Sequence, residues 1–154
     1  MEPSQLSGDP LLLDNQLCFG LYAASRRVIH LYAPLLTRLD ITYTQYITLL
    51  VLWEHRRLAV KAIGDSLMLD SGTLTPMLKK LEKKGLVTRR RSTEDERSVI
   101  VELTGTGAAM KEEALAFLPS LLCTSCLTPP ELVELRELLH KLLHGLEEDA
   151  APPA

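Results

Sequence analysis

The run LDSGTLTPMLKKLEKKG, together with the two β-rich runs that follow it, constrains the fold of this 154-residue chain more than any other feature. Asp70 or Ser71 can cap a helix at the start of the run, and Gly85 can end it. The β-rich runs are joined by the polar link STEDER, which is typical of a hairpin. The sequence therefore predicts a helix over about 71–84 and a β-hairpin over about 86–103.

The predicted helix has one apolar face and one polar face. Leu74, Leu78 and Leu81 recur at helical spacing and are expected to point inward. Hydroxyls and lysines occupy the outward and flanking positions Ser71, Thr73, Thr75, Lys79, Lys80 and Lys83. Short hydroxyl side chains can reach base edges in the major groove of DNA, and lysines can contact phosphates. The pattern is typical of a DNA recognition helix.

Positive charge is concentrated around the same segment. The net charge is −3, yet eleven Lys/Arg and six Asp/Glu lie between Arg56 and Arg97, a balance of +5 against −8 for the remainder. The hairpin contributes Arg89, Arg91 and Arg97, and an arginine at a hairpin tip can enter a narrow minor groove. Because element order and charge location agree, DNA binding is favoured over a merely solvated charged surface.

Helical patterns precede this segment. Asp9 and Pro10 can open a long helix over about 10–39. Thr42 and Gln45 have the form of a capping box that opens the next helix. Four apolar side chains of that second helix are expected to point inward, namely Ile47, Leu50, Val51 and Trp53.

The remaining pattern completes the predicted order of elements. A short helix over about 60–67 follows, which gives 42–104 the order of a winged helix-turn-helix module. After the hairpin, a helix over about 108–122 and a last helix opened by the motif TPPE are predicted. The expected fold class is mainly α with a small β-hairpin wing, a winged helix-turn-helix within a single domain over 1–154.

Both ends of the chain are rich in leucine. The regions 10–39 and 108–148 carry more leucine than a winged module of this size can cover, and an exposed face that apolar would be a liability. We expect the two regions to form the dimerisation region of a two-fold homodimer. An intrachain helical bundle is the alternative.

Several other classes of protein are disfavoured. No apolar run approaches the ~18 residues of a membrane span, and MEPSQLSGDP is unlike a secretion signal, so a cytoplasmic location is expected. Cys123 and Cys126 have C-x-x-C spacing, but neither a second pair nor nearby histidines complete a zinc tetrad. We therefore expect no metal and no cofactor. Nothing resembles a reductase-recycled peroxidase, so no enzyme is expected.

The third cysteine, Cys18, lies beside the apolar stripe of the first predicted helix. It heads a row on which Tyr22 and Tyr32 place hydroxyls among hydrocarbon. Because cysteine is among the most buried residues, a packing thiol is the simpler interpretation from these residues alone. A reactive thiol, whose thiolate the tyrosine hydroxyls would stabilise, remains open.

Several segments of the chain together resemble the MarR family of winged-helix regulators, and within it the organic hydroperoxide resistance regulators. They are LDNQLCFGLYAASR, ITYTQY, VLWEH, LDSGTLTPMLKKLEKKGLVTRRRSTEDERSV and LTGTG, and the resemblance extends from Leu13 to Leu146. It implies a homodimeric repressor that binds double-stranded DNA at a pseudo-palindromic operator. It also implies that Asp95 orients Arg97 in the minor groove.

The same resemblance implies roles for the cysteines. Cys18 falls at the position of the peroxide-reactive cysteine, and Tyr32 and Tyr43 fall where tyrosines hydrogen-bond its sulfur across the dimer. Cys123 and Cys126 match the region of a second, resolving cysteine, and Cys123 is the favoured one. The resemblance thus implies that organic hydroperoxide oxidises Cys18, a disulfide forms and DNA is released. A repressor that responds to a small phenolic ligand without cysteine chemistry is the alternative.

Overall fold

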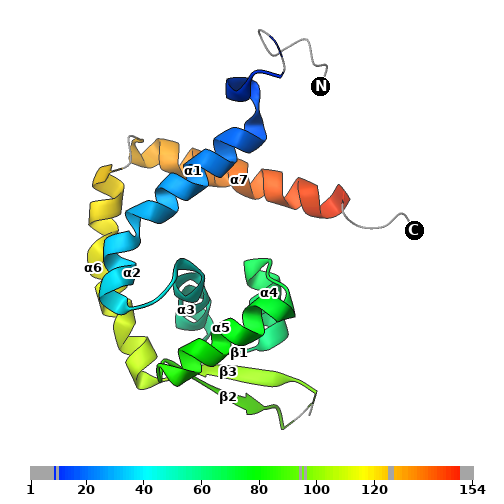
Figure 1. Cartoon of the computed structure of the whole chain (residues 1–154), viewed down its shortest axis with the longest axis vertical. Coiled ribbons are helices and arrows are strands. Elements are labelled where there is room, and N and C mark those ends of the chain that lie inside the picture. Colours follow the sequence, from blue (N-terminus) through cyan, green and yellow to red (C-terminus); the bar gives the residue numbers. More distant parts are fainter. Residues whose placement is uncertain (1–8, 10, 94, 96, 125–126, 150–154) are drawn as a thin grey trace. The chain divides into compact units, whose positions relative to one another are not determined.

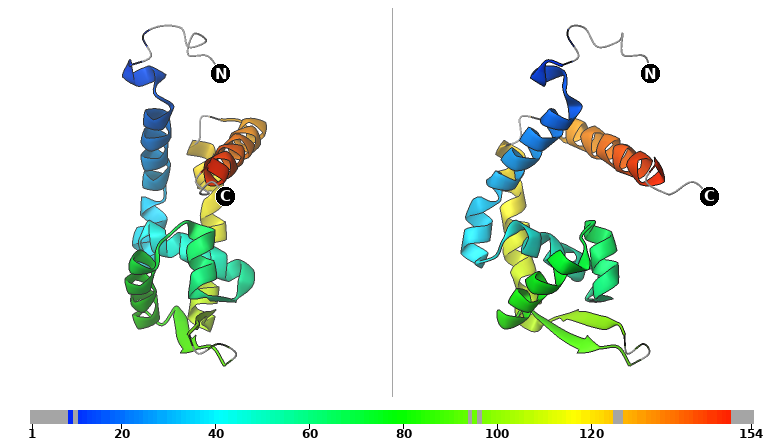
Figure 2. Two further views of the ribbon diagram at one scale, coloured as in Figure 1. Left: turned by 90° about the vertical axis from the view of Figure 1, so that its right-hand side faces the viewer. Right: turned by 45° about the vertical axis from the view of Figure 1, so that its right-hand side comes forward.

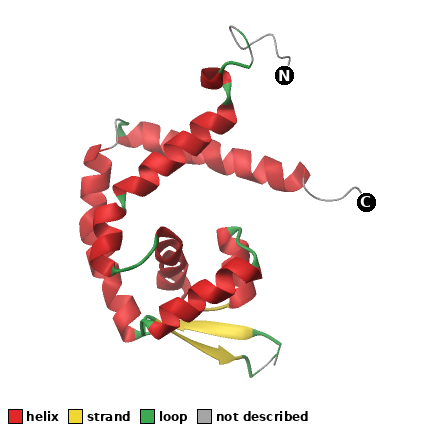
Figure 3. Cartoon of the chain, in the orientation of Figure 1, coloured by secondary structure: helices red, strands yellow, loops and turns green. Residues whose placement is uncertain are grey.

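The computed structural model describes residues 9, 11–93, 95, 97–124 and 127–149, without the side chains of 122–124 and 147–149. Helices make up most of the described chain, and the strands form one small sheet (Figure 3). The chain divides into two compact units, Met1–Phe117 and Leu118–Ala154. Each unit is described by itself.

Apart from one short strand, the first unit contains the elements of the predicted winged module in the predicted order (Figure 1). They are η2 (Leu13–Asn15), α1 (Leu17–Leu31), α2 (Ala33–Leu39), α3 (Tyr43–His55), β1 (Arg57–Ala59), α4 (Val60–Leu67), α5 (Ser71–Lys83), β2 (Val87–Arg91), β3 (Val99–Leu103) and most of α6 (Gly105–Thr124). The second unit contains the end of α6 and α7 (Pro129–Asp149). No helix among the described residues is both long enough and apolar enough to cross a membrane.

The prediction of one long helix over 10–39 was wrong. Asp9 accepts a hydrogen bond from the backbone N–H of Leu11 in a local turn, and regular α-helix begins only at Leu17. A second break falls at Tyr32, because Pro34 lies in the first turn of α2 and has no N–H to continue the bonding of α1. The single predicted helix is therefore a short turn followed by two helices.

The capping box at the start of α3 was predicted correctly. Thr42 accepts a hydrogen bond from the backbone N–H of Gln45 at 3.3 Å, and the Gln45 side chain accepts one from the Thr42 N–H at 3.0 Å. The predicted inward face was right only in part: Ile47 and Trp53 pack against the core, whereas Leu50 is 43% exposed. Leu49 and Leu52, which were not predicted to point inward, are fully buried. Apolar residues surround this helix on nearly all sides, so their spacing does not define the inward face.

The sheet has three antiparallel strands in the order β1-β3-β2. β2 and β3 form the predicted hairpin, with Val87 opposite Leu103, and the hairpin extends beyond the helices of the first unit in both views of Figure 2. β1 was not predicted, because three residues are too few to show an alternating pattern. It pairs with β3 and places Leu58 opposite Val101.

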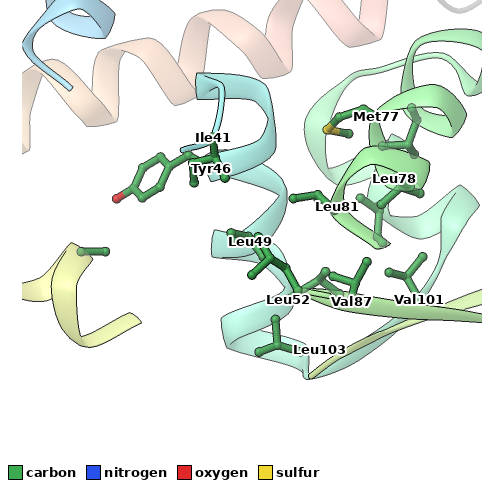
Figure 4. Packing of buried hydrophobic residues seen from close by; sticks show 14 of the residues in the cluster. Ile41, Tyr46, Leu49, Leu52, Met77, Leu78, Leu81, Val87, Val101 and Leu103 are labelled. Carbon is green, nitrogen blue, oxygen red and sulfur yellow. The ribbon is translucent and has the colours of Figure 1, made fainter. Parts of the chain in front are cut away.

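The core lies between α3, α5 and the sheet. Leu49 and Leu52 of α3 meet Leu81 of α5 and Val87 of β2 (Figure 4). The ring of Tyr46 points away from these leucines in the same view. The short module therefore has one well-packed centre that fixes α5 against the sheet.

The helix α6 starts three residues earlier than predicted, inside the motif TGTG. Thr104 caps it, because its hydroxyl accepts a hydrogen bond from the backbone N–H of Gly107 at 3.0 Å. A Cβ atom at Gly107 would lie 2.2 Å from the carbonyl oxygen of Leu86, so only glycine fits there. The motif TGTG therefore forms the first turn of α6, and this turn packs closely against Leu86.

Candidate DNA-binding surface and cysteine site

The helix α5 presents the polar face that the sequence predicted. Asp70 caps it by accepting hydrogen bonds from the hydroxyl of Thr73 at 2.8 Å and from its backbone N–H at 2.9 Å. Both hydrogen bonds lower the pKa of Asp70, and the bond from the Thr73 hydroxyl has the larger effect. The side chains of Ser71, Thr73, Lys79, Lys80 and Lys83 are exposed, and that of Thr75 is half-buried. The predicted face is therefore open to a ligand while Leu74, Leu78 and Leu81 are buried.

A cavity of about 580 Å³ lies between α4, α5 and the hairpin. Ser71 and Thr75 of α5 line it together with Asp95 and Arg97 of the hairpin link. The structure thus brings the predicted helix face and the predicted hairpin-tip residues to one hollow. Asp95 accepts a hydrogen bond from the backbone N–H of Arg97 at 3.0 Å, which shapes the turn at the tip.

The four arginines of the hairpin are not equivalent. Arg89 points to the helix side of the sheet and pairs with Glu82 at 2.9 Å, where its side chain is only 21% exposed. Arg90 pairs with Glu102 on the opposite face at 2.6 Å. The side chains of Arg91 and Arg97 are exposed. The structure therefore gives Arg89 a structural partner that the sequence did not show.

Cys18 is a free and exposed cysteine on α1. The packing interpretation that the residues alone favoured is therefore wrong for the single chain. Leu17 and Leu21 beside it are 67% and 36% exposed. Tyr22, one turn further along α1, accepts a hydrogen bond from the Arg26 guanidinium at 2.8 Å.

Tyr32 and Tyr43 lie together in a cluster of aromatic rings. Their centroids are 5.6 Å apart, and the ring of Tyr46 lies 5.4 Å from that of Tyr32. The pKa of Tyr32 is raised, mainly because the phenol is partly buried and to a lesser extent because Tyr43 lies beside it. The sequence did not single out Tyr46 or Phe117, whose ring lies 6.4 Å from that of Tyr32. Their contact could be found only once the helices were packed.

Within one chain the structure keeps Cys18 apart from this tyrosine cluster. Helix α1 is continuous from Leu17 to Leu31, and the rise of a helix puts Cys18 about 20 Å along the axis from Tyr32. Cys123 lies in α6, but its side chain and all of Cys126 are outside the described residues. The described residues hold no group of three or more metal-ligating side chains.

Comparison with known proteins places these features in a family. The model of the family described as transcriptional regulator SarA/Rot matches residues 30–114. The organic hydroperoxide resistance transcriptional regulator of Bacillus subtilis (strain 168) is 51% identical over 140 residues, which cover 91% of this chain and 95% of that protein. The chain belongs to the MarR family of winged-helix transcriptional regulators.

Solved structures of MarR-family proteins show the same fold. Reduced AbfR bound to DNA is 40% identical with a TM-score of 0.73, over 87% of this chain and 94% of that chain. The disulfide-formed AbfR is 36% identical with a TM-score of 0.65, and the match covers 94% of this chain and 97% of that chain. A mutant MarR from E. coli, complexed with operator DNA, is 29% identical with a TM-score of 0.73, and the match covers 88% of this chain and 99% of that chain. The predicted winged helix-turn-helix fold is confirmed.

Proposed function

We propose that the chain is a homodimeric repressor that binds operator DNA while Cys18 is reduced and releases it when an organic hydroperoxide oxidises Cys18. The observation that carries the proposal is the 51% identity, over nearly the whole chain, to an organic hydroperoxide resistance regulator. The position of the Cys18 thiol supports it, because the thiol is exposed in the single chain and is not packed into that chain's own core.

Operator binding is assigned to the exposed face of α5 and to the hairpin tip. The hydroxyls and lysines of α5 would meet the major groove, and Arg97 and Arg91 would meet the minor groove and the flanking phosphates. Arg89 is held by Glu82 and positions the hairpin on α5 instead. The contacting set is then Ser71, Thr73, Thr75, Lys79, Lys80, Lys83, Arg91 and Arg97, with Asp95 shaping the tip.

A second copy of the chain is the partner that the apolar helix faces need. Leu17 and Val28 of α1 are 67% and 51% exposed, and Leu138 and Leu146 of α7 are each 58% exposed. A homodimer built from these faces would cover them. It would also let Cys18 of one chain meet Tyr32 of the partner subunit, which the separation of about 20 Å forbids within one chain.

The chemistry starts from the thiolate. A tyrosine with its ordinary pKa of about 10 is protonated at neutral pH. Burial raises the pKa of Tyr32 further, so its hydroxyl keeps its proton and can donate a hydrogen bond to the sulfur anion. The thiolate attacks one peroxide oxygen, the O–O bond breaks, and the departing alkoxide takes a proton to become an alcohol. Cys18 is left as a sulfenic acid. A second thiol then displaces water from the sulfenic acid and forms a disulfide.

The second thiol is assigned to Cys123, with Cys126 as the other possibility. Cys123 is in the last turn of α6, so a bond to Cys18 of the partner subunit would pull on that helix. The half-sites of an operator are read at a fixed spacing, so a small displacement of the two winged modules is enough to lose binding.

Replacement of Cys18 by serine tests the proposal. The operator duplex is first selected from a random-sequence DNA library with the reduced protein. Cumene hydroperoxide should release the duplex from the natural protein and leave the Cys18→Ser complex intact, as measured by fluorescence anisotropy. Mass spectrometry under non-reducing conditions should find a Cys18–Cys123 bond between two chains, with Cys126→Ser as the control. Release from Cys18→Ser would favour a repressor that responds to a phenolic ligand.

A further inference from the structure

The tyrosine cluster and the DNA-binding elements are joined by a series of ring contacts and hydrogen bonds. The ring of Tyr46 touches Tyr32 on one side, and on the other it meets Trp53 edge-on, with centroids 6.0 Å apart. The indole N–H of Trp53 donates a hydrogen bond to the carbonyl oxygen of Gly107 at 2.8 Å. Trp53 therefore connects the cluster to the first turn of α6.

The first turn of α6 is in turn bound to the end of the recognition helix. The hydroxyl of Thr104 donates to the carbonyl oxygen of Gly85 at 2.7 Å and lies 3.0 Å from that of Leu86. The backbone N–H of Thr104 also donates to Leu86 at 3.1 Å. Gly107 presses so closely on Leu86 that a side chain would not fit. Leu86 lies between α5 and β2, so this point holds both DNA-binding elements.

Helix α6 meets the tyrosine cluster a second time, at Phe117. The ring of Phe117 lies 6.4 Å from that of Tyr32, and ten residues of helix, about 15 Å, separate it from Gly107. One helix therefore touches the tyrosine cluster near its middle and the end of the recognition helix at its start. A packed helix moves as a body, so a shift at one contact displaces the other.

We propose that Trp53, Thr104 and Gly107 form the joint through which the state of the cysteine site reaches the recognition helix. The inference rests on the proposed redox function. These are positioning residues, since none of them touches the sulfur or the oxidant. Their hydrogen bonds fix the first turn of α6 to both α3 and the α5–β2 connection. Movement of α6 then carries α3, the end of α5 and the base of the wing with it.

Two threonines of the same motif allow a matched test. Thr104→Val removes the hydroxyl that binds Gly85 and Leu86, whereas Thr106→Val changes an exposed side chain two residues later. Trp53→Phe removes the indole N–H and keeps an aromatic ring. The readout in each full-length protein is the ratio of operator Kd after cumene hydroperoxide to operator Kd before it. Mass spectrometry measures Cys18 oxidation in the same samples.

We expect Thr104→Val and Trp53→Phe to lower this ratio by about tenfold, a usual size for allosteric coupling, while Cys18 is oxidised as fast as in the natural protein. Thr106→Val and the hydroxyl-retaining Thr104→Ser should keep the full ratio. Equal ratios in Thr104→Val and Thr106→Val would overturn the proposal. Loss of operator binding by both reduced variants would assign the contacts to folding and would overturn it as well.

The Cys18→Ser protein separates failure of the joint from failure of the redox function. If Cys18→Ser releases the operator as the natural protein does, the redox function is wrong, and the inference fails with it. If Cys18→Ser holds the operator and Thr104→Val keeps the full ratio, only the joint is wrong.

Discussion

At the scale of single residues, the surroundings of Tyr32 matter most for the proposed chemistry. Its phenol is half-buried among other rings, which raises its pKa, so it stays protonated over the range in which a thiol ionises. Because the pKa of Tyr32 is raised by folding, its protonated form stabilises the folded chain fully below the ordinary tyrosine pKa. That contribution to the free energy of unfolding is lost as the pH rises through the raised pKa. Ionisation of Tyr32 should therefore cause no fall in the rate of Cys18 oxidation below about pH 10, as measured by stopped-flow mixing over a series of pH values.

Tyr32→Phe should slow Cys18 oxidation by cumene hydroperoxide roughly ten- to a hundredfold, because a hydrogen bond to a charged group contributes roughly 1.5–3 kcal/mol. Stopped-flow mixing with quantification of sulfenic acid measures the rate. Tyr46→Phe keeps the ring that touches Tyr32 and is the control. Equal rates in the two variants would remove Tyr32 from the thiolate site.

The arginines of the hairpin provide a second residue-scale prediction. Arg97→Ala should weaken operator binding, and it should reduce the slope of log Kd against log salt concentration by about one. The reason is that one charge that neutralises a phosphate is lost. Arg90→Ala removes the same charge from a side chain that pairs with Glu102, and it should change the salt slope little. Anisotropy titrations at several salt concentrations measure both. A larger effect for Arg90 would place the opposite face of the sheet against DNA.

At the scale of elements, the sequence predicted the helices and strands with distinct local signals. Capping residues at Thr42 and Asp70 and the leucine spacing of α5 fixed α3 and α5 closely. The break at Tyr32 was missed because the apolar stripe continues through it, although Pro34 was the available signal. β1 and the contacts of Tyr46 depend on partners far along the chain. No local pattern of residues contains that information.

The start of α6 gives an element-scale prediction. Gly107→Ala should lower the free energy of unfolding by about 1–3 kcal/mol, because the new methyl group would meet the Leu86 carbonyl oxygen and backbone cannot move aside cheaply. Gly105→Ala, in the same turn and with nothing within 4 Å, should be neutral or stabilising. Urea unfolding followed by circular dichroism distinguishes them. Equal stability of the two variants would contradict the close approach of α6 to Leu86.

At the scale of the whole molecule, the exposed apolar faces of α1 and α7 predict a dimer that dissociates when one face is charged. Val28 is 51% exposed, and Val28→Glu should convert a particle of twice 17.1 kDa into one of 17.1 kDa and abolish operator binding. Sedimentation equilibrium measures the mass. Lys111→Glu, an exposed change on α6, should stay dimeric. A dimeric Val28→Glu protein would place the interface elsewhere.

The length of α1 between Cys18 and Tyr32 has a genetic consequence. Each sensor would be assembled from halves that belong to different polypeptides, so a Cys18→Ser chain and a Tyr32→Phe chain would be deficient for different reasons. Co-expressed in one cell, the two alleles would complement each other, because a mixed pair still contains one intact combination of sulfur and phenol.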